Sequence, residues 1–172
     1  VHDCFAQANL SGYDCHGDVR VCAEADNPKR HYLRLQSGAG ISRACETSGQ
    51  DELSMALDVP AGTAALNFAG VTVQLGGAQA SINGQNVPDI ADSRYVVAFK
   101  RFHAPQRCEV WLNNRPAMMC ACDAAAKTSF TLTASEAGEI RLNRVDWKDQ
   151  TDVPILVENF TLMPMNCRLL AE

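Results

Sequence analysis

Two basic clusters and one tryptophan are the residues of this sequence best suited to recognising a ligand. Lysine and arginine side chains arranged as a stripe bind sulfate and carboxylate groups through charge-assisted hydrogen bonds. The same charges on an edge strand also prevent two sheets from pairing, so both interpretations stay open. The clusters are Lys29–Arg30–His31 with Arg34, and Lys100–Arg101 with His103 and Arg107.

Trp111 is the third candidate, because its position alternates with those of two apolar neighbours. If Val110 and Leu112 face the core from a strand, the Trp111 ring faces outward. An outward indole serves as a surface or interface residue, or as a platform for the apolar face of a sugar ring. The expected ligand-binding residues are therefore Trp111, Lys100, Arg101 and Arg107.

The cysteines are even in number and are spread along the whole chain. A zinc site is disfavoured because no C-x-x-C pair occurs, the Cys120–Ala121–Cys122 spacing is too tight, and the four histidines lie far apart. We therefore expect all eight cysteines to form disulfides, which favours an oxidising compartment. They are Cys4, Cys15, Cys22, Cys45, Cys108, Cys120, Cys122 and Cys167.

Other local features of the sequence also point to secretion. Two N-x-S/T sequons, at Asn9 and Asn159, are typical of glycoproteins that pass through a secretory pathway. The chain begins on Val1 and reaches a cysteine three residues later, as a mature product does after a targeting segment has been removed. We therefore expect a secreted, extracellular glycoprotein.

The overall composition limits the classes of protein to which the chain can belong. A length of 172 residues suits one domain, which buries roughly 70% of its unfolded surface. Hydrophobic residues make up 47% of the chain and charged residues 20%, and no apolar run is long enough to span a membrane. The net charge of −5 argues against binding to nucleic acid, because that affinity depends mainly on clustered cations that neutralise phosphates.

Alternating strands must position these residues. Tyr95, Val97 and Phe99 alternate with other side chains, and the run ending at Leu112 repeats the pattern before Asn113–Asn114. Asn83–Gly84 is a strong hairpin signal, and further short strands recur without a helical stripe. We predict an all-β antiparallel β-sandwich, as a single domain over residues 1–172. Residues 51–172 hold the sandwich, and residues 1–50 are a disulfide-rich segment of loops and short strands.

The strand pair around Asn113–Asn114 predicts one disulfide in particular, between Cys108 and Cys120. Facing Cα atoms at a non-hydrogen-bonded position lie about 4.5 Å apart, within reach of a bridge. A two-residue turn would instead place Cys108 opposite Met119 and leave Cys122 as a competitor. With a three-residue loop at 113–115, the facing pairs are Leu112 with Pro116, Val110 with Met118, and Cys108 with Cys120.

From about residue 52 to 163, the order of these strand patterns resembles the laminin-G-like and pentraxin-like jelly rolls of the concanavalin type. The resemblance rests on the succession "RYVVAFKR", "CEVWLNN", "EIRLNRVDW" and "ILVENFTLM". It implies that the sandwich is a jelly roll. The first 50 residues have no counterpart in it.

The resemblance also implies a site for calcium, which laminin-G-like domains hold through an Asp, an Asn and backbone carbonyls at one rim. The expected ligands in this chain are Asn143, Asp146 and Asp149, with Asp89, Asp92 and Asp152 as other oxygen donors. Acidic loops are often no more than solvated turns, so calcium is kept as an open expectation.

Hydrolysis is disfavoured by the arrangement of carboxyl groups. Concanavalin-type enzymes that cut β-glucans carry paired carboxylates in an E-x-D-x-x-E pattern, which this sequence lacks. Glu139, Asp146 and Asp149 are the nearest acidic set, and residues 140–142 break its spacing. There is also no G-x-S-x-G motif, and an even cysteine count leaves no spare thiol. We expect that the chain is not an enzyme and that no hydrolysis depends on Glu139 or Asp146.

These observations favour a secreted binding or adhesion module whose partner is an extracellular glycan or another extracellular protein. A hydrolase with an unrecognised site is a third hypothesis. The main alternative is a structural subunit of an extracellular filament, coat or matrix. In that alternative the chain self-associates, and Cys4 and Cys167 serve contacts between copies.

Overall fold

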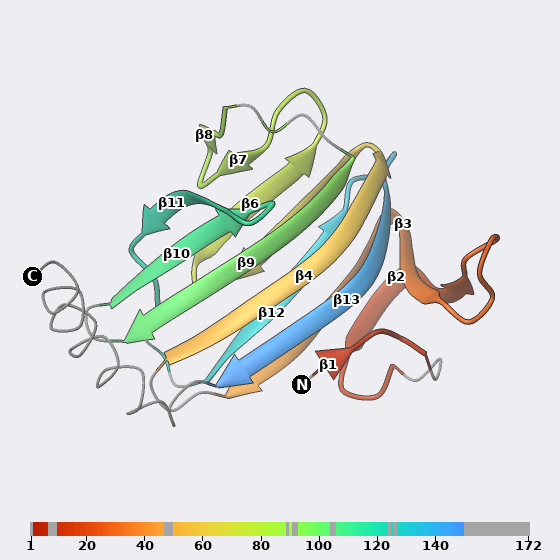
Figure 1. The fold of residues 1–172 in the computed structure, drawn as a ribbon, viewed down its shortest axis with the longest axis horizontal. Coiled ribbons are helices and arrows are strands. Elements are labelled where there is room, and N and C mark those ends of the chain that lie inside the picture. Colours follow the sequence, from red (N-terminus) through yellow and green to blue (C-terminus); the bar gives the residue numbers. More distant parts are fainter. Residues whose placement is uncertain are drawn as a thin grey trace, which may run out of the picture.

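The computed structural model describes residues 2–6, 10–46, 50–88, 90, 93–103, 106–123, 125 and 127–149. Regular structure in these residues is entirely β-strand, in one curled antiparallel sheet (Figure 1). They contain no helix that is long and apolar enough to cross a membrane. The predicted all-β antiparallel architecture is confirmed. The strands are β1 His2–Asp3, β2 Asp14–Ala23, β3 His31–Glu46, β4 Gln50–Ala61, β5 Thr63–Phe68, β6 Val71–Gly76, β7 Ser81–Ile82, β8 Gln85–Asn86, β9 Arg94–His103, β10 Gln106–Leu112, β11 Arg115–Cys120, β12 Lys127–Ala134 and β13 Glu139–Asp149.

The sheet folds over at β3 and so forms two layers. Hydrogen bonds join the strands in the order β11-β10-β9-β4-β13-β3-β12-β5-β6-β7-β8, with β1 beside β13 and β2 beside β3. Residues 33–36 of β3 pair with β13, whereas residues 40–46 pair with β12. We call β11, β10, β9, β4, β13, β1, the first half of β3 and residues 18–23 of β2 beside it the front layer. The rest forms the back layer, which includes β12 and β6 behind the front strands in Figure 1.

Alternating apolar side chains from the two layers meet in the core. On β4, Leu53, Met55 and Leu57 are at most 1% exposed, while the residues between them are half-buried on the outer face. Phe68 of the back layer packs against Phe99 and Trp147 of the front layer, with ring centroids 5.5 and 5.7 Å apart. Each such side chain contributes about 1.5–3 kcal/mol when it is fully buried, so this interface is what holds the layers together.

The prediction that residues 1–50 form only loops and short strands is wrong. This segment contains β2 and the 16-residue β3, which pairs with strands of both layers. Ser37 and Gly38 interrupt the alternation of β3 with φ angles of 53° and 77°. At Gly40, a Cβ would collide with the ring of His16 on β2. The small residues that suggested a loop are therefore the positions at which a long strand turns from one layer to the other.

The hairpin of β10 and β11 has the predicted pairing of its cysteines but a different turn. Leu112 faces Arg115 across a two-residue turn, and both turn residues have positive φ, 50° at Asn113 and 63° at Asn114. These angles are typical of a type I′ turn. A bulge at Ala117 then shifts the register by one residue, so Cys108 faces Cys120 as predicted. All seven described cysteines are unbridged in the structure, and Cys167 lies outside the described residues.

A buried ion pair connects β4 and β9 inside the sandwich. Arg101 and Asp51 face each other in register, and both side chains are 0% exposed. Arg101 donates from Nη2 to Asp51 Oδ2 at 2.5 Å and from Nε to the same oxygen at 3.0 Å. Its Nη1 donates to the carbonyls of Asp123 and Ala125, between β11 and β12. The pair therefore fastens two front strands and a connection between the layers at one point.

We expect Arg101→Met to lower the free energy of unfolding by about 3–5 kcal/mol, because the buried carboxylate of Asp51 loses its paired guanidinium and keeps only His103 Nε2, 4.0 Å away. Chemical denaturation followed by circular dichroism measures the change. Combining it with Asp51→Leu should recover most of the loss, since both charges are then gone. Lys100→Met, on the outer face of the same strand, is the matched control and should cost less than about 1 kcal/mol. An Arg101→Met protein as stable as the parent would contradict this role of the pair.

Candidate functional site

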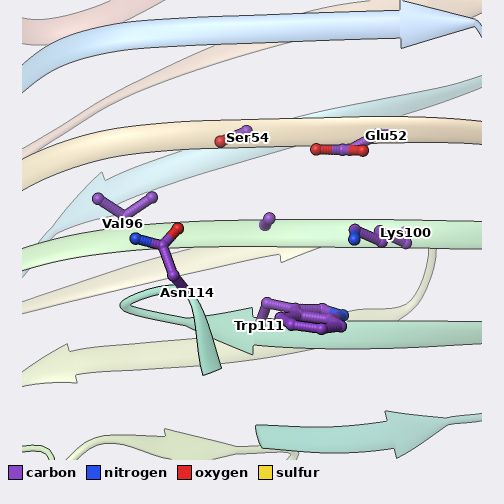
Figure 2. A pocket seen from close by; sticks show the side chains of 7 residues that line it. Glu52, Ser54, Val96, Lys100, Trp111 and Asn114 are labelled. Carbon is purple, nitrogen blue, oxygen red and sulfur yellow. The ribbon is translucent and has the colours of Figure 1, made fainter. Parts of the chain in front are cut away.

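A shallow groove lies on the outer face of the front layer, across β4, β9 and β10 (Figure 2). Alternation places it there, because the apolar residues of these strands point into the core and the intervening residues point outward. Its volume is about 220 Å³. The lining residues are Glu52, Ser54, Val96, Ala98, Lys100, Trp111 and Asn114.

The groove exists because small side chains occupy neighbouring positions on two strands. Ser54 of β4 faces Ala98 of β9, and one row further along Ala56 faces Val96. In the next strand, Trp111 faces Ala98. A large ring beside a floor of small side chains makes a hollow with one wall, which is the shape that a sugar ring fits.

Trp111 faces outward, as its phase predicts, and Lys100 covers part of its ring. The Lys100 ammonium lies 4.3 Å from the ring centroid, a cation–π contact that orients the indole. The indole Nε1 donor is buried and makes no hydrogen bond within the described part of the chain. A buried donor of this kind ordinarily has a partner, which a bound group or an ordered water can supply.

A row of charged residues borders the groove at one end. Lys148 of β13 faces Glu52 of β4, which faces Lys100 of β9, which in turn faces Glu109 of β10. Opposite charges directly across a sheet attract each other, so this row is self-neutralising. It ends the hollow with groups that can donate and accept hydrogen bonds.

A second hollow of about 450 Å³ continues the groove at the other end and shares Val96 and Asn114 with the first. Asp58 lies in it, accepts a hydrogen bond from Asn143 Nδ2 at 3.1 Å and pairs with Arg94 Nε at 3.4 Å. The combined groove therefore has a small, mostly apolar middle and polar ends.

The type I′ turn places an amide at the groove that the sequence analysis did not single out. Asn113 is tied to β9, since its Oδ1 accepts from Val96 N and its own N donates to Val96 O, both at 2.8 Å. This holds the turn against β9 and leaves the Asn114 side chain beside Val96 in the groove (Figure 2). The sequence signal for this turn was the Asn113–Asn114 pair, because asparagine tolerates the positive φ that a type I′ turn needs at both positions.

The structure brings together only two of the four predicted ligand-binding residues. Lys100 and Trp111 line the groove. Arg107 shares their strand face but lies further along, with its guanidinium 4.5 Å from the ring centroid of Phe102 and 3.6 Å from Glu109. Arg101, expected beside Lys100 on the surface, is in the interior in its ion pair with Asp51. Its position in the strand, in phase with Phe99, turns it inward.

The predicted calcium ligands do not converge. Asn143 bonds to Asp58, whereas Asp146 pairs with His2 and with Arg144 Nε at 2.8 Å. Asp149 faces Asp51 in the last pair of β13 with β4. No group of three or more His, Cys, Asp or Glu side chains in the described residues is placed to hold a metal ion. The donors in the described part of the chain therefore do not form the six to eight converging oxygens that a calcium ion needs. Asp152 lies outside that part.

Glu139 is held as a carboxylate and is unsuited to act as a general acid. Arg141 Nε donates to its Oε1 at 2.7 Å, and Gln36 Nε2 donates to its Oε2 at 2.9 Å. The bond from Arg141 is the main reason why the pKa of Glu139 is lowered, with the bond from Gln36 adding to it. A general acid needs the opposite shift. Asp89, Asp92 and the two sequon asparagines, Asn9 and Asn159, lie outside the described residues.

No protein-family model matches the sequence, and no curated protein is significantly similar to it. Solved structures show the fold. A sialidase matches with a TM-score of 0.70 and 13% identity over 88% of this chain, which spans only 18% of the sialidase chain. The β-glucanase of Bacillus licheniformis matches with a TM-score of 0.58 and 12% identity, over 87% of this chain and 98% of its own. The metal-free carbohydrate recognition domain of Emp46p matches with a TM-score of 0.55 and 10% identity, over 84% and 91%.

These structures include enzymes and a carbohydrate recognition domain, so they share a fold rather than one activity. The fold of this chain is therefore a jelly roll of the concanavalin type, as predicted. The matches do not single out the laminin-G-like and pentraxin-like domains within that group.

The lowered pKa of Glu139 makes stability depend on pH in one direction. A carboxyl group whose pKa is lower in the folded state stabilises the fold above its unfolded pKa, ordinarily 4.5, and loses that contribution as the pH falls through the folded value. We therefore expect Glu139→Gln to be less stable than the parent at neutral pH, with the difference closing below about pH 4.5. Denaturation midpoints measured across this range test it. Glu136→Gln, in an exposed turn, controls for the loss of one negative charge, and a gap that widens at low pH would contradict the assignment.

Proposed function

We propose that the chain is a secreted module that binds a glycan in the groove on the outer face of β4, β9 and β10. The hollow of small residues beside Trp111 is the observation that carries this proposal. An indole edge or face packs on the apolar side of a pyranose, while the polar groups at both ends of the groove bond to its hydroxyls. The fold supports the same conclusion, because similar structures include a carbohydrate recognition domain and enzymes whose names denote glycan substrates.

An adhesion role fits the same proposal, because a module that binds one glycan on a cell surface links its carrier to that surface. Self-assembly through a sheet edge is less well supported. The edge strand β11 carries Met119, which is 63% exposed, but it also contains Pro116 and the bulge at Ala117. Proline and bulges are features that prevent an edge strand from pairing with another sheet.

Glycan binding is tested by screening the purified chain on a glycan array and measuring the best ligand by titration calorimetry. Ala98→Leu fills the floor of the groove and Trp111→Ala removes its wall, so each should weaken binding about tenfold or more, which is about 1.4 kcal/mol. Met119→Ala, on the exposed edge strand β11 and not among the residues that line the groove, is the matched control. Thermal melts verify that all three variants fold.

Two results would count against this proposal. Unchanged affinity in both groove variants would place the glycan elsewhere. Concentration-dependent polymers in size-exclusion chromatography, with no glycan bound on the array, would favour the structural subunit of an assembly.

If the protein is secreted, its cysteines should be oxidised to disulfides. This oxidation stays a prediction. Cys108 is buried, and burial raises the pKa of its thiol, with the neighbouring Cys122 and Cys120 adding to the rise in that order. A raised pKa makes the free thiol unreactive once the sandwich has closed, so a bridge must form earlier, during folding. Cys120 is the partner directly across the hairpin, and Cys122 is the competitor.

We expect alkylation without reductant, followed by mass spectrometry, to label no cysteine of the secreted protein. Peptide mapping of the non-reduced chain should yield a fragment that joins Cys108 to Cys120. Each bridge is worth about 2–4 kcal/mol through restriction of the unfolded chain. A Cys108–Cys122 fragment, or two or more labelled thiols, would contradict this pairing.

A further inference from the structure

A row of arginines crosses the outer face of the front layer beyond the groove. Arg20 of β2 faces Arg34 of β3, Arg34 faces Arg141 of β13, and Arg141 in turn faces Asp58 of β4. These strands lie side by side in Figure 1. The row therefore begins at the groove, because Asp58 lines the second hollow.

Alternation turns all three arginines to the same face as the groove. Arg34 lies between Leu33 and Leu35, and Arg141 between Ile140 and Leu142, and all four of these apolar residues are 0% exposed in the core. Arg20 lies between Val19 and Val21, which pack against the core from the edge strand β2. The guanidinium groups therefore share one surface.

The three arginines face one another across adjacent strands, and carboxylates next to the row pair with two of them, Asp18 with Arg20 and Glu139 with Arg141. Neighbouring strands are about 4.8 Å apart, and the three Cα atoms therefore span only about 10 Å. An anion that lies along the row can therefore reach three guanidinium groups within this short span.

Two of these arginines bond to a nearby carboxylate, and each does so only through its Nε atom. Arg20 Nε donates to Asp18 at 2.6 Å, and Arg141 Nε donates to Glu139 at 2.7 Å. Their terminal Nη groups make no hydrogen bond with any described residue, although the Arg141 guanidinium also lies 5.7 Å from the ring centroid of Tyr32. Arg34 makes no hydrogen bond with a described residue, but its charge helps to lower the pKa of Glu139. Since each guanidinium carries five N–H donors, most of the donors in the row are available to a ligand.

We propose that Arg20, Arg34 and Arg141 bind the sulfate or carboxylate groups of an acidic polysaccharide that extends from the groove. The inference rests on the proposed function, because it assigns a substrate class to the same face. Guanidinium groups match the planar oxygens of carboxylates and the oxygens of sulfates in paired hydrogen bonds. Asp18 and Glu139 offset two of the three positive charges. The row therefore recognises its ligand mainly through hydrogen bonds from the guanidinium N–H groups, and less through its net positive charge.

The test compares heparin, which is sulfated, with polygalacturonate, which carries only carboxylates, and with a neutral β-glucan. We expect one or both acidic polymers to bind the full chain more tightly than the neutral one, with an affinity that falls as salt is raised. Arg34→Gln should weaken acidic binding at least threefold, and Arg20→Gln with Arg34→Gln should weaken it further. Arg107→Gln, on the same face but outside the row, is the matched control and should leave binding unchanged.

Thermal melts separate loss of binding from loss of folding, because a variant that melts at the temperature of the parent is folded. Acidic binding that is unchanged in the double variant, or reduced equally by Arg107→Gln, would overturn the inference. So would a neutral glucan that binds as tightly as the acidic polymers. If Trp111→Ala has no effect while Arg34→Gln abolishes acidic binding, the groove proposal fails and the arginine row stands.

Discussion

The buried pair of Arg101 and Asp51 is the constraint on which the outer face depends. The two side chains face each other from β9 and β4, and no neighbouring register would leave both charges neutralised in the core. A slip of one residue would also turn every side chain of a strand to the opposite face. The ion pair thus fixes which residues of β4 and β9 meet on the surface, including Ser54 with Ala98 at the floor of the groove.

Much of the fold could be predicted from local patterns. Alternation identified β9 and β10 and the outward direction of Trp111, and Asn83–Gly84 marked the β7–β8 hairpin. The same alternation placed Arg101 in phase with Phe99, and Asp51 in phase with Leu53. Arg101 was nevertheless predicted to lie on the surface, because its charge was given more weight than its position in the alternation. Two opposite charges at inward positions of two strands were the available signal for a buried pair, but nothing local identifies partners 50 residues apart.

Most of the candidate site could not be predicted, because it depends on which distant strands are neighbours. Ser54, Ala56, Val96 and Ala98 are unremarkable in the sequence and become a hollow only when β4 lies beside β9. The arginine row needs β2, β3 and β13 to be adjacent, although more than a hundred residues separate Arg34 from Arg141. For the arginine row, the cause is that the sequence did not predict the full length of β3. Glycine and serine at its bend looked like a loop, and without that strand the two halves of the face cannot be joined.

The bend in β3 therefore links the architecture to both proposals. The first half of β3 pairs with β13 and its second half with β12, so this single strand joins the two layers. β2 pairs with the other edge of β3 and is the outer strand. The front layer gains the width of two further strands on the side away from Trp111. A sheet that ended at β13 would hold only the hollow and its charged ends. With β3 and β2 added, the same face extends from a site suited to one sugar ring to a surface suited to a longer, charged chain.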